Sequence, residues 1–335
     1  QEPQIRQRCM LALKKSTVES AGRWPALSAS LRTTSMKQRA AQALYQPPPD
    51  RTPDQWADEK RILPKVSAEP GPFRSKRTPY MIPIMREAAN PRRKRIVAVL
   101  GSQMGKTDGQ LNIIGQRLDD DPVPVLYVGP TKSNVEKVIE PRIMKMVRAV
   151  PSLLEQLATG KASSKTYKAI AGVSLRLAWA GSPTELASQD AALVLVDELD
   201  RMKADVGSEG SPLDLAEARF ETYADGKSVV TSTPTEGNVT TVVDENGLER
   251  WDVAEAEDLA SAIWRAWQPG TRFEWAWPCP HCGEYFIPRY KLLDIPPSAT
   301  PQQAKRGARL RCPHCAALIE DTQKTQMNDR GVYVA

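Results

Sequence analysis

The stretch at residues 96–115, IVAVLGSQMGKTDGQLNIIG, decides how the rest of this 335-residue sequence is interpreted. An apolar run typical of a buried strand leads into a loop that ends in Gly-Lys-Thr at 105–107, and a helical pattern follows. The phosphate-binding P-loop has the pattern Gly, four residues, then Gly-Lys-Ser/Thr. Leu100 stands where the first glycine belongs, and Gly101 is one position late. The stretch is therefore either a chance GKT in a loop or a nucleotide site of unusual sequence.

Four further apolar runs follow, each short enough for a buried strand, and helical patterns separate most of them. They are VLYVG at 125–129, VSLRLAWA at 173–180, ALVLVD at 192–197 and SVVTST at 228–233. Short buried strands that alternate with helices are typical of a parallel sheet covered by helices. We therefore expect an α/β fold with a central, mostly parallel sheet.

Changes in composition along the chain suggest three regions. Residues 1–50 form a basic N-terminal segment that we expect to be partly helical or flexible, and residues 51–245 form the α/β core with its lead-in segment. Five of the eight tryptophans then fall between residues 251 and 277. The acidic stretch VVDENGLERWDVAEAEDLASAIW at 242–264 is typical of a loop and an amphipathic helix with a solvated acidic face. Residues 246–335 are thus predicted to hold a connector helix and a small metal-binding domain.

The net charge of +6 is unevenly distributed along the chain. Residues 1–100 contain 20 Lys and Arg against 8 Asp and Glu, whereas the remainder contains 26 against 32. A basic front part attracts polyanions such as DNA, although a solvated, partly disordered leader has the same composition. No apolar run approaches the roughly 20 residues that cross a bilayer, so we expect no membrane partner.

Two adjacent acids, Asp197 and Glu198, follow the apolar run that begins at Leu193. An Asp at the end of a buried strand suits Mg²⁺ binding, and the adjacent Glu suits a general base that polarises the attacking water. The alternative is that both acids only cap the next helix. The GKT motif favours the nucleotide site, since Lys106 would neutralise phosphate charge and Thr107 would bind Mg²⁺. The strand end VVTSTPT at 229–235 adds a hydroxyl-rich segment of the kind that ATP motors place beside the acidic strand.

Four of the five cysteines form two CPHC motifs, at 279–282 and 312–315, and 29 residues separate them. Two such knuckles supply four thiolates for a tetrahedral Zn²⁺ site, and a shell closed by four cysteines indicates a structural role. The histidines at 281 and 314 are possible substitute ligands. The predicted zinc ligands are Cys279, Cys282, Cys312 and Cys315.

The motifs together resemble one known family. In chain order they are PYMIPIMREAANP, VLGSQMGKTDGQLN, VLYVGPT, SPTELASQDAALVLVDELDR, EGSPLDLAEARF, STPT and the two CPHC knuckles. From about residue 45 to the end they resemble the large terminase subunit of lambda-like tailed phages. The resemblance implies a P-loop ATPase of the RecA-like, additional-strand glutamate type, followed by a zinc ribbon. Such a subunit is an ATP-driven motor that translocates double-stranded DNA into a procapsid. An RNase H-like nuclease domain is expected after residue 335, in a longer parent chain.

The resemblance also accounts for the irregular loop, because terminases of this type tolerate Gln-x-Gly-Lys-Thr in place of the glycine-led pattern. It implies that Asp197 binds Mg²⁺, that Glu198 is the catalytic acid, and that Ser232-Thr233-Pro234 is a coupling segment. Tyr80 matches an adenine-contacting segment of the family, although a tyrosine of the core is the alternative. The residues that match the P-loop itself are Gln103, Gly105, Lys106 and Thr107.

One departure from the family concerns arginine. Many terminases carry a P-loop arginine near the position of Ser102 or Gln103, and this sequence has neither Arg nor Lys there. An arginine acting in trans must then come from elsewhere, and the candidates are Arg142 in EPRIM and Arg219 in EARFE, although most helix arginines are simply solvated. We therefore expect a homo-oligomeric ring in the active state. The other implied partners are double-stranded DNA, the small terminase subunit and the portal protein, in the host cytoplasm during phage assembly.

Two other functions fit parts of the sequence. A helicase-like P-loop remodeller of nucleic acid would need helicase motifs and a second RecA-like domain downstream, and the sequence offers neither. A zinc-ribbon nucleic-acid-binding protein with a degenerate P-loop is the second alternative. ATP hydrolysis measured with and without Lys106 separates that alternative from an ATPase.

Overall fold

The computed structural model describes residues 48–158, 160, 163–187, 190–237 and 239–335. The chain divides into two units, Gln1–Pro48 and Pro49–Ala335, and the described elements belong to the second. The predicted basic segment at 1–50 lies almost entirely outside the described residues, and the predicted division near residue 245 stays a prediction. No helix among the described residues combines the length and the apolar composition needed to cross a membrane.

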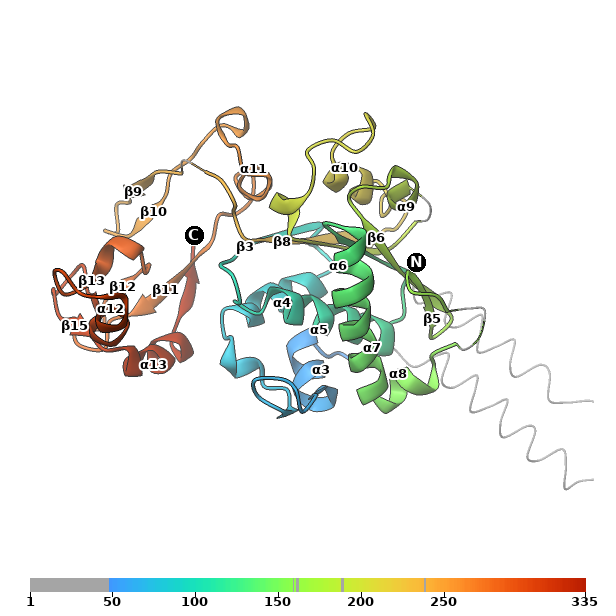
Figure 1. Ribbon diagram of the computed structural model, residues 1–335, viewed down its shortest axis with the longest axis horizontal. Helices are drawn as coiled ribbons and strands as arrows, with labels where there is room; N and C mark the ends of the chain where they lie inside the picture. The colour runs from blue at the N-terminus through green and yellow to red at the C-terminus, as the bar shows by residue number, and fades with distance from the viewer. Residues whose placement is uncertain (1–47, 159, 161–162, 188–189, 238) are drawn as a thin grey trace, which may run out of the picture. The chain divides into compact units, whose positions relative to one another are not determined.

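A six-stranded sheet forms the centre of the fold (Figure 1). Its strands are parallel except for one antiparallel edge strand, as the apolar runs of the sequence predict. In sheet order they are β3 (Arg95–Val99), β8 (Lys227–Ser232), β7 (Leu193–Asp197), β4 (Val125–Gly129), β6 (Val173–Trp179) and β5 (Tyr167–Ile170). Strand β8 thus lies between the strand before the GKT motif and the strand that ends in Asp197.

Alternate residues of the strands supply two separate cores, one on each face of the sheet. On β4, Val125 and Tyr127 belong to the first core, whereas Leu126 and Val128 belong to the second, as the period-two geometry of a strand requires. The first core includes α3 (Pro53–Lys60), α4 (Met81–Ala89), α5 (Lys106–Asp119), α7 (Glu140–Ala149) and α8 (Pro151–Glu155). The second includes α9 (Pro183–Ala187), α10 (Pro212–Glu217) and α11 (Ala262–Trp267), on the opposite face in Figure 1.

Shorter elements complete the lead-in and the connections of this core. They are β1 (Ile62–Leu63), β2 (Gly71–Pro72), the 3-10 turn η1 (Ser75–Arg77), α6 (Lys132–Asn134), the π-helical turn η2 (Val135–Ile139) and the 3-10 turn η4 (Leu199–Arg201).

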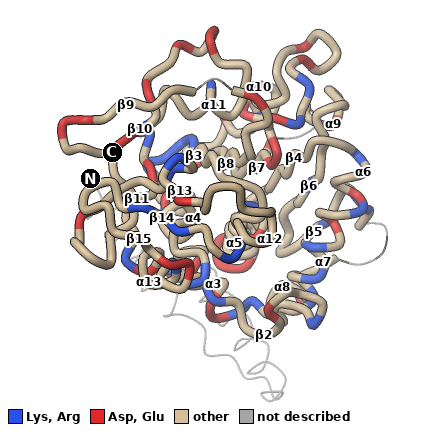
Figure 2. The backbone as a smooth tube through the Cα atoms, turned by 60° about the vertical axis from the view of Figure 1, so that its left-hand side comes forward, with Lys and Arg blue, Asp and Glu red and all other residues tan. Residues whose placement is uncertain are grey.

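The acidic stretch after residue 241 does not form the predicted amphipathic helix. Strands β9 (Thr241–Val243) and β10 (Glu249–Trp251) form an antiparallel hairpin instead, with acidic residues at its turn (Figure 2). The Asp244 carboxylate accepts the N–H groups of Asn246 and Leu248, and Gly247 takes the left-handed conformation that such a turn requires. A second acidic run forms the 3-10 turn η5 (Ala256–Asp258), and only α11 is helical. Local turn chemistry therefore outweighs the helical periodicity.

Two small antiparallel sheets carry the cysteine motifs. The first orders as β12-β11-β16, and the second as β13-β14-β15. Their strands are β11 (Glu274–Pro278), β12 (Tyr285–Phe286), β13 (Leu293–Asp294), β14 (Arg309–Arg311), β15 (Leu318–Ile319) and β16 (Val332–Val334). Short helical elements accompany them, namely η6 (Tyr290–Leu292), α12 (Pro301–Gly307), η7 (Asp321–Gln323) and α13 (Lys324–Asp329).

A tight contact between α3 and α5 sets the position of the helix that follows the GKT motif. Trp56 of α3 is fully buried, and its indole Nε1 donates to Asp119 at 2.8 Å. A Cβ atom added at Gly115 would lie 2.0 Å from the ring carbon Cη2 of Trp56. Only glycine at this position therefore lets the two helices approach.

We expect Gly115→Ala to destabilise the protein although alanine is the better helix former. The helix propensity gained is about 1 kcal/mol, whereas overpacking of a core typically costs about 1–3 kcal/mol, and the 2.0 Å approach puts this site at the costly end. Urea unfolding of the wild type and the variant measures the difference. Gly181→Ala is the control, because its added Cβ would meet only ordinary contacts, at 3.5 Å and beyond. Equal or greater stability of Gly115→Ala would contradict the packing argument.

Candidate nucleotide and metal sites

The loop between β3 and α5 is shaped by two left-handed residues. Gly105, directly before α5, has a φ of 80°, and Gln103 has a φ of 58°. Glycine adopts this conformation at little cost, whereas for glutamine it is uncommon. Strained backbone of this kind clusters at ligand-binding sites. The loop between β3 and α5 therefore has an uncommon backbone conformation. A chance GKT motif would not need such a conformation.

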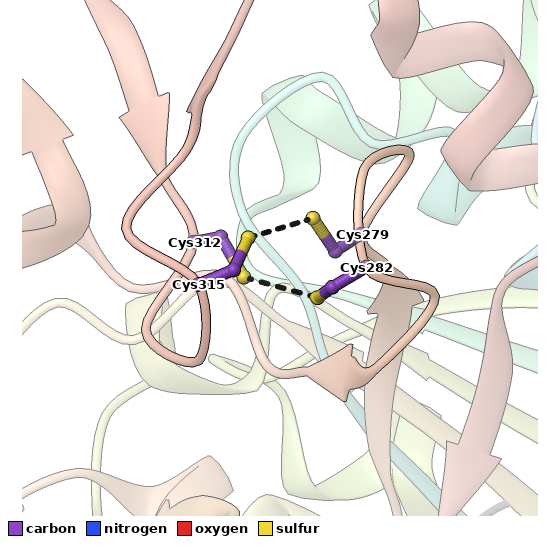
Figure 3. A group of neighbouring side chains, drawn as sticks. All are labelled: Cys279, Cys282, Cys312 and Cys315. Carbon is purple, nitrogen blue, oxygen red and sulfur yellow. Dashed lines mark hydrogen bonds between the residues drawn. The ribbon is translucent and has the colours of Figure 1, made fainter.

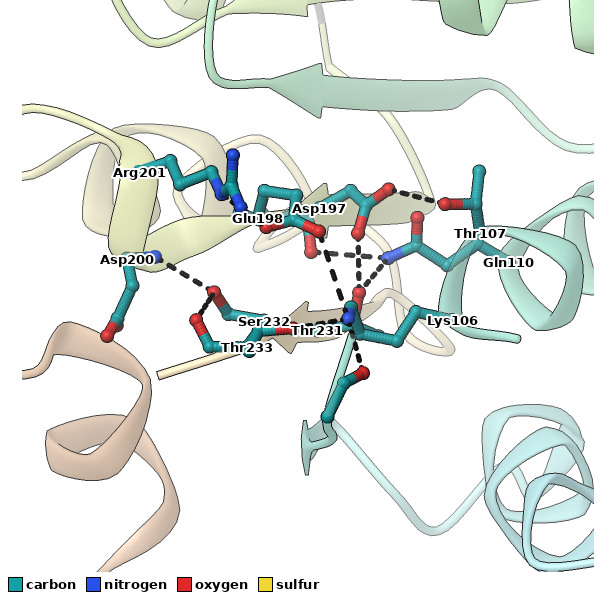
Figure 4. Close-up of polar contacts among 12 residues, drawn as sticks. Lys106, Thr107, Gln110, Asp197, Glu198, Asp200, Arg201, Thr231, Ser232 and Thr233 are labelled. Atoms are coloured by element: carbon teal, nitrogen blue, oxygen red, sulfur yellow. Dashed lines mark hydrogen bonds and ion pairs between the residues drawn. The ribbon is translucent and has the colours of Figure 1, made fainter. Parts of the chain in front are cut away.

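Lys106 opens α5 and points into the carboxyl edge of the sheet (Figure 4). Its Nζ donates to the carbonyl oxygen of Gly101 at 2.9 Å and to Oγ1 of Thr233 at 2.6 Å. The Oε1 atom of Glu198 is 3.8 Å away. With its side chain only 6% exposed, this ammonium group is held among acceptors from the loop, from the end of β8 and from the acidic pair. A phosphate oxygen bound at this edge of the sheet would accept hydrogen bonds from the same ammonium group.

Asp197 is a buried carboxylate that three hydroxyl groups approach. Thr107 and Tyr127 donate to its Oδ2 at 3.1 and 2.9 Å, and Thr231 donates to its Oδ1 at 2.8 Å. Burial, followed by the charge of Asp197, raises the pKa of Tyr127 well above its usual value, so Tyr127 stays a donor. Thr107 and Asp197 thus stand side by side, and their oxygen atoms could bind Mg²⁺.

Glu198 has a strained backbone, and its carboxylate lies near two cationic side chains. Its φ is 59°, and although it precedes η4 its side chain makes no capping hydrogen bond. Its buried Oε2 has no hydrogen-bond partner, although Nε of Arg201 lies 3.0 Å away as an ion pair. The cap alternative finds no support in these contacts, since the Glu198 carboxylate faces Lys106 and Arg201 and does not cap η4.

Several residues of this site were not singled out from the sequence. Tyr127 lies in the middle of a buried apolar strand, where a phenol needs a partner, and that was the available signal. The Nε2 atom of Gln110, on α5, donates to the carbonyl of Val196 at 3.2 Å and to Thr231 at 3.1 Å. Arg201 becomes visible only through its contact with Glu198.

The two arginine candidates make their contacts with groups other than the Lys106 ammonium group. Arg142 on α7 pairs with Asp108 at 3.3 Å, and Asp108 also pairs with the buried Arg61. Arg219 follows α10, and its backbone carbonyl accepts from Ala191, before the start of β7. It therefore lies at the amino end of the strand whose carboxyl end is Asp197. Neither arginine contacts Lys106 or Glu198, so a role in trans stays a prediction for both.

Tyr80 lies at the start of α4 and is 8% exposed. Its ring meets Trp275 of β11 edge-on, with centroids 6.2 Å apart, and its hydroxyl lies 3.8 Å from the sulfur of Met104 in the GKT loop. Tyr333 of β16 donates to its carbonyl oxygen at 3.0 Å. These are the contacts of the core alternative, and the adenine contact stays a prediction.

The four predicted cysteine ligands come together, as Figure 3 shows, at the turns after β11 and β14. All four Sγ atoms lie within 4.8 Å of one another, and the facing pairs are 3.8 and 3.9 Å apart. Four sulfurs at about 2.3 Å from a tetrahedral Zn²⁺ ion stand about 3.8 Å apart. His314 is occupied otherwise, since its Nε2 lies 3.1 Å from the carbonyl oxygen of Tyr285. The sulfur geometry therefore fits a metal ion with four cysteine ligands.

The acidity of the thiols differs across this cluster. Burial acts to raise the pKa of Cys279, but hydrogen bonds from the backbone N–H groups of Cys282 and His281 outweigh it and lower the pKa to about 7. Burial raises the pKa of Cys312 to about 12. Four negative sulfurs at these separations repel one another, and a divalent cation between them offsets that repulsion.

Comparisons with known proteins give matches that cover most of the chain. Residues 67–333 match the family model described as phage terminase large subunit gpA, ATPase domain. The large terminase subunit of Enterobacteria phage P21 is 24% identical over 290 residues. That alignment covers 83% of this chain and 41% of the phage P21 protein, so the chain spans about two fifths of that relative.

Solved structures give weaker likenesses. The HK97 bacteriophage large terminase has a TM-score of 0.45 and 14% identity, over 54% of this chain and 37% of that one. The ATPase domain of the Thermus phage P74-26 large terminase has a TM-score of 0.33 and 19% identity, over 43% of this chain and 61% of that one. Likenesses at this level assign no role to any residue.

Proposed function

This chain belongs to the gpA family of phage terminase large subunits, and it matches the ATPase domain of that family. From that premise we propose that it hydrolyses ATP to move double-stranded DNA into a procapsid. One observation carries the assignment of the site. Asp197 ends β7, Thr233 directly follows β8, and Lys106 begins the helix after β3. These three strands are neighbours, and the three side chains converge at one edge of the sheet. In open α/β sheets the carboxyl ends of the strands are where ligands bind.

In this proposal each group has a role that its contacts support. The N–H groups of the loop and of the first turn of α5, with the Lys106 ammonium group, hold the β- and γ-phosphates. Thr107 and Asp197 hold Mg²⁺, which neutralises charge on the phosphate oxygens when bound. Glu198 accepts the proton of the water that attacks the γ-phosphorus atom, because its carboxylate lies 3.8 Å from the Lys106 ammonium group that would hold that phosphate.

The end of β8 would sense the γ-phosphate. Lys106 donates to Thr233 in the structure, and a bound phosphate would compete for that ammonium group. Loss of the phosphate after hydrolysis would restore the contact. Ser232-Thr233-Pro234 would thereby report the state of the nucleotide, which is the coupling role that the family resemblance implies.

We also propose the partners and the DNA cleavage of the full-length terminase, which involve more than this chain. Its partners would be double-stranded DNA, the small terminase subunit and the portal protein, and a longer parent would also cut DNA. Of the two alternatives, a zinc-ribbon nucleic-acid-binding protein with a degenerate P-loop would bind nucleic acid without turnover. A helicase-like remodeller would separate strands, whereas a packaging motor moves duplex DNA intact.

Substitutions at the acidic pair and the lysine separate binding from turnover. Lys106→Ala should weaken binding of a fluorescent ATP analogue, because it removes the only ammonium group described in the loop. Glu198→Gln should keep binding and reduce the hydrolysis rate by about 10²–10⁴-fold, since an amide keeps the shape and cannot accept the proton. Lys203→Ala and Glu209→Gln are matched controls, because both residues are exposed in the loop after the acidic strand. Normal hydrolysis by Glu198→Gln in the assembled motor would show that another group is the base.

The missing P-loop arginine predicts that turnover depends on assembly. An arginine supplied by a neighbouring subunit accelerates such reactions by about 10³–10⁵-fold. The hydrolysis rate per chain should therefore rise steeply with protein concentration or on binding to procapsids. In the assembled state, Arg142→Ala and Arg219→Ala should identify which candidate acts in trans. Fast hydrolysis that is independent of concentration, from a chain shown to be monomeric by light scattering, would contradict the prediction.

We further propose that the four-cysteine site holds one structural Zn²⁺ ion per chain. Metal analysis of the natively purified protein should find one zinc, and Cys312→Ser should lose it. Binding energies of about 10–16 kcal/mol in zinc-finger peptides mean that chelation should unfold the ribbon. Hydrogen exchange should then increase in β11–β16 and change little in the six-stranded sheet. Cys9→Ser is the control, since the fifth cysteine lies outside both motifs. Full occupancy by zinc in Cys312→Ser would exclude this ligand set.

A further inference from the structure

Asp200, three residues after the proposed Mg²⁺-binding acid Asp197, joins three separate parts of the chain. Its carboxylate accepts hydrogen bonds from the backbone N–H of Thr235 at 3.0 Å, from the hydroxyl of Ser261 at 2.7 Å and from the N–H of Ile263 at 2.7 Å. Its own backbone N–H donates to the hydroxyl of Ser232 at 3.1 Å. No role for this residue follows from its sequence neighbours alone.

One side of this junction leads to the nucleotide site. Ser232 and Thr235 flank Thr233, whose hydroxyl accepts from the Lys106 ammonium group at 2.6 Å. A phosphate that drew Lys106 away would change the hydrogen bonding at the end of β8. Asp200 holds that segment at two points, through the Ser232 hydroxyl and the Thr235 N–H, so a shift there reaches Asp200 directly.

The other side of the junction leads to α11. Ser261 is the N-cap of this helix, because its hydroxyl accepts the N–H of Trp264, and the same hydroxyl donates to Asp200. Trp264 stacks edge-on against Trp267 and against Trp251 of the β9–β10 hairpin, with centroids 5.2 Å apart in both pairs. The first turn of α11 is thus fixed to Asp200, and its aromatic face is fixed to the hairpin.

The helix also has free volume beside it. An open surface pocket of about 560 Å³ lies between α10 and α11, and its lining includes Asp200, Thr235, Ser261 and Arg265. This pocket leaves space beside α11, a helix of six residues, and we expect the helix to shift when its anchor moves.

We propose that Asp200 is a positioning residue that transmits the state of the nucleotide from the end of β8 to α11 and to the hairpin beyond it. The inference rests on the proposed function, since it presupposes that a phosphate competes for Lys106. It adds the route by which the event at the phosphate leaves the site: Lys106, the end of β8, Asp200 and the Ser261 cap. Asp200 itself contacts neither Lys106 nor Glu198 in the structure.

The test is hydrogen exchange of the full chain with and without Mg²⁺ and a non-hydrolysable ATP analogue. In the wild type the analogue should change the exchange rates of peptides that cover α11. In Asp200→Asn this change should be lost while the dissociation constant of the analogue stays within about threefold. The asparagine amide nitrogen cannot accept from Ser261 or Thr235. Exchange of α11 without nucleotide should also rise by roughly 5–30-fold, as expected when a helix cap is lost.

Two serine variants separate transmission from simple stability. Ser261→Ala removes the α11 end of the route and leaves the acidic loop unchanged, so it should reproduce the loss. Ser211→Ala is the matched control: Ser211 caps α10 and donates to Asp214 at 2.7 Å, and among the described residues it has no hydrogen bond to β8. It should loosen α10 and leave the response of α11 to nucleotide intact.

Each outcome has a distinct meaning. If the wild type does not bind the analogue, the proposed nucleotide site fails. If it binds and α11 does not respond, or if Asp200→Asn and Ser261→Ala both keep the wild-type response, the transmission role is wrong while the nucleotide site stands. Should Asp200→Asn fail to fold, Ser261→Ala alone decides between these outcomes.

Discussion

Asp197 accepts hydrogen bonds from Thr107, Tyr127 and Thr231, which belong to α5, β4 and β8, and these bonds fix the ends of neighbouring strands around one buried carboxylate. A charge buried to 3% exposure is stable only with such partners. The parallel register makes them available, because it brings the carboxyl ends of β8, β7 and β4 to one edge. Lys106, Glu198 and the end of β8 are all positioned relative to this edge. The site is thus a consequence of strand order before it is a consequence of any single motif.

Much of the core could be predicted from the sequence, because its signals are local and repeated. Apolar runs of five to eight residues predicted all five parallel strands to within a residue or two, and the spacing of two knuckles was enough to bring four cysteines together. Buried parallel strands leave little ambiguity, since both faces are apolar. The adjacency of β7 and β8 was likewise expected from the motifs, and the pairing of Asp197 with Thr231 confirms it.

The features that could not be predicted from the sequence depend on contacts between distant segments. Asp200 reads as one more acid in DELD, and its significance lies in Ser261 and Ile263, more than sixty residues away. Tyr127 looks like a core residue until its hydroxyl is seen to meet Asp197. The prediction for the acidic stretch was wrong for a local reason. The turn chemistry around Asp244, which is visible in the sequence, outweighs the helical periodicity.

The contacts of Tyr80 have a mechanical consequence. Tyr333 in β16 is bonded to the carbonyl of Tyr80, although 253 residues separate them, and the Tyr80 hydroxyl meets Met104 in the loop before Lys106. Trp275 in β11 braces the same ring from the side. Tension applied along β16 would therefore reach the phosphate-binding loop through three side chains, bypassing the sheet. A displacement of β16 and a displacement of this loop are therefore coupled through Tyr80.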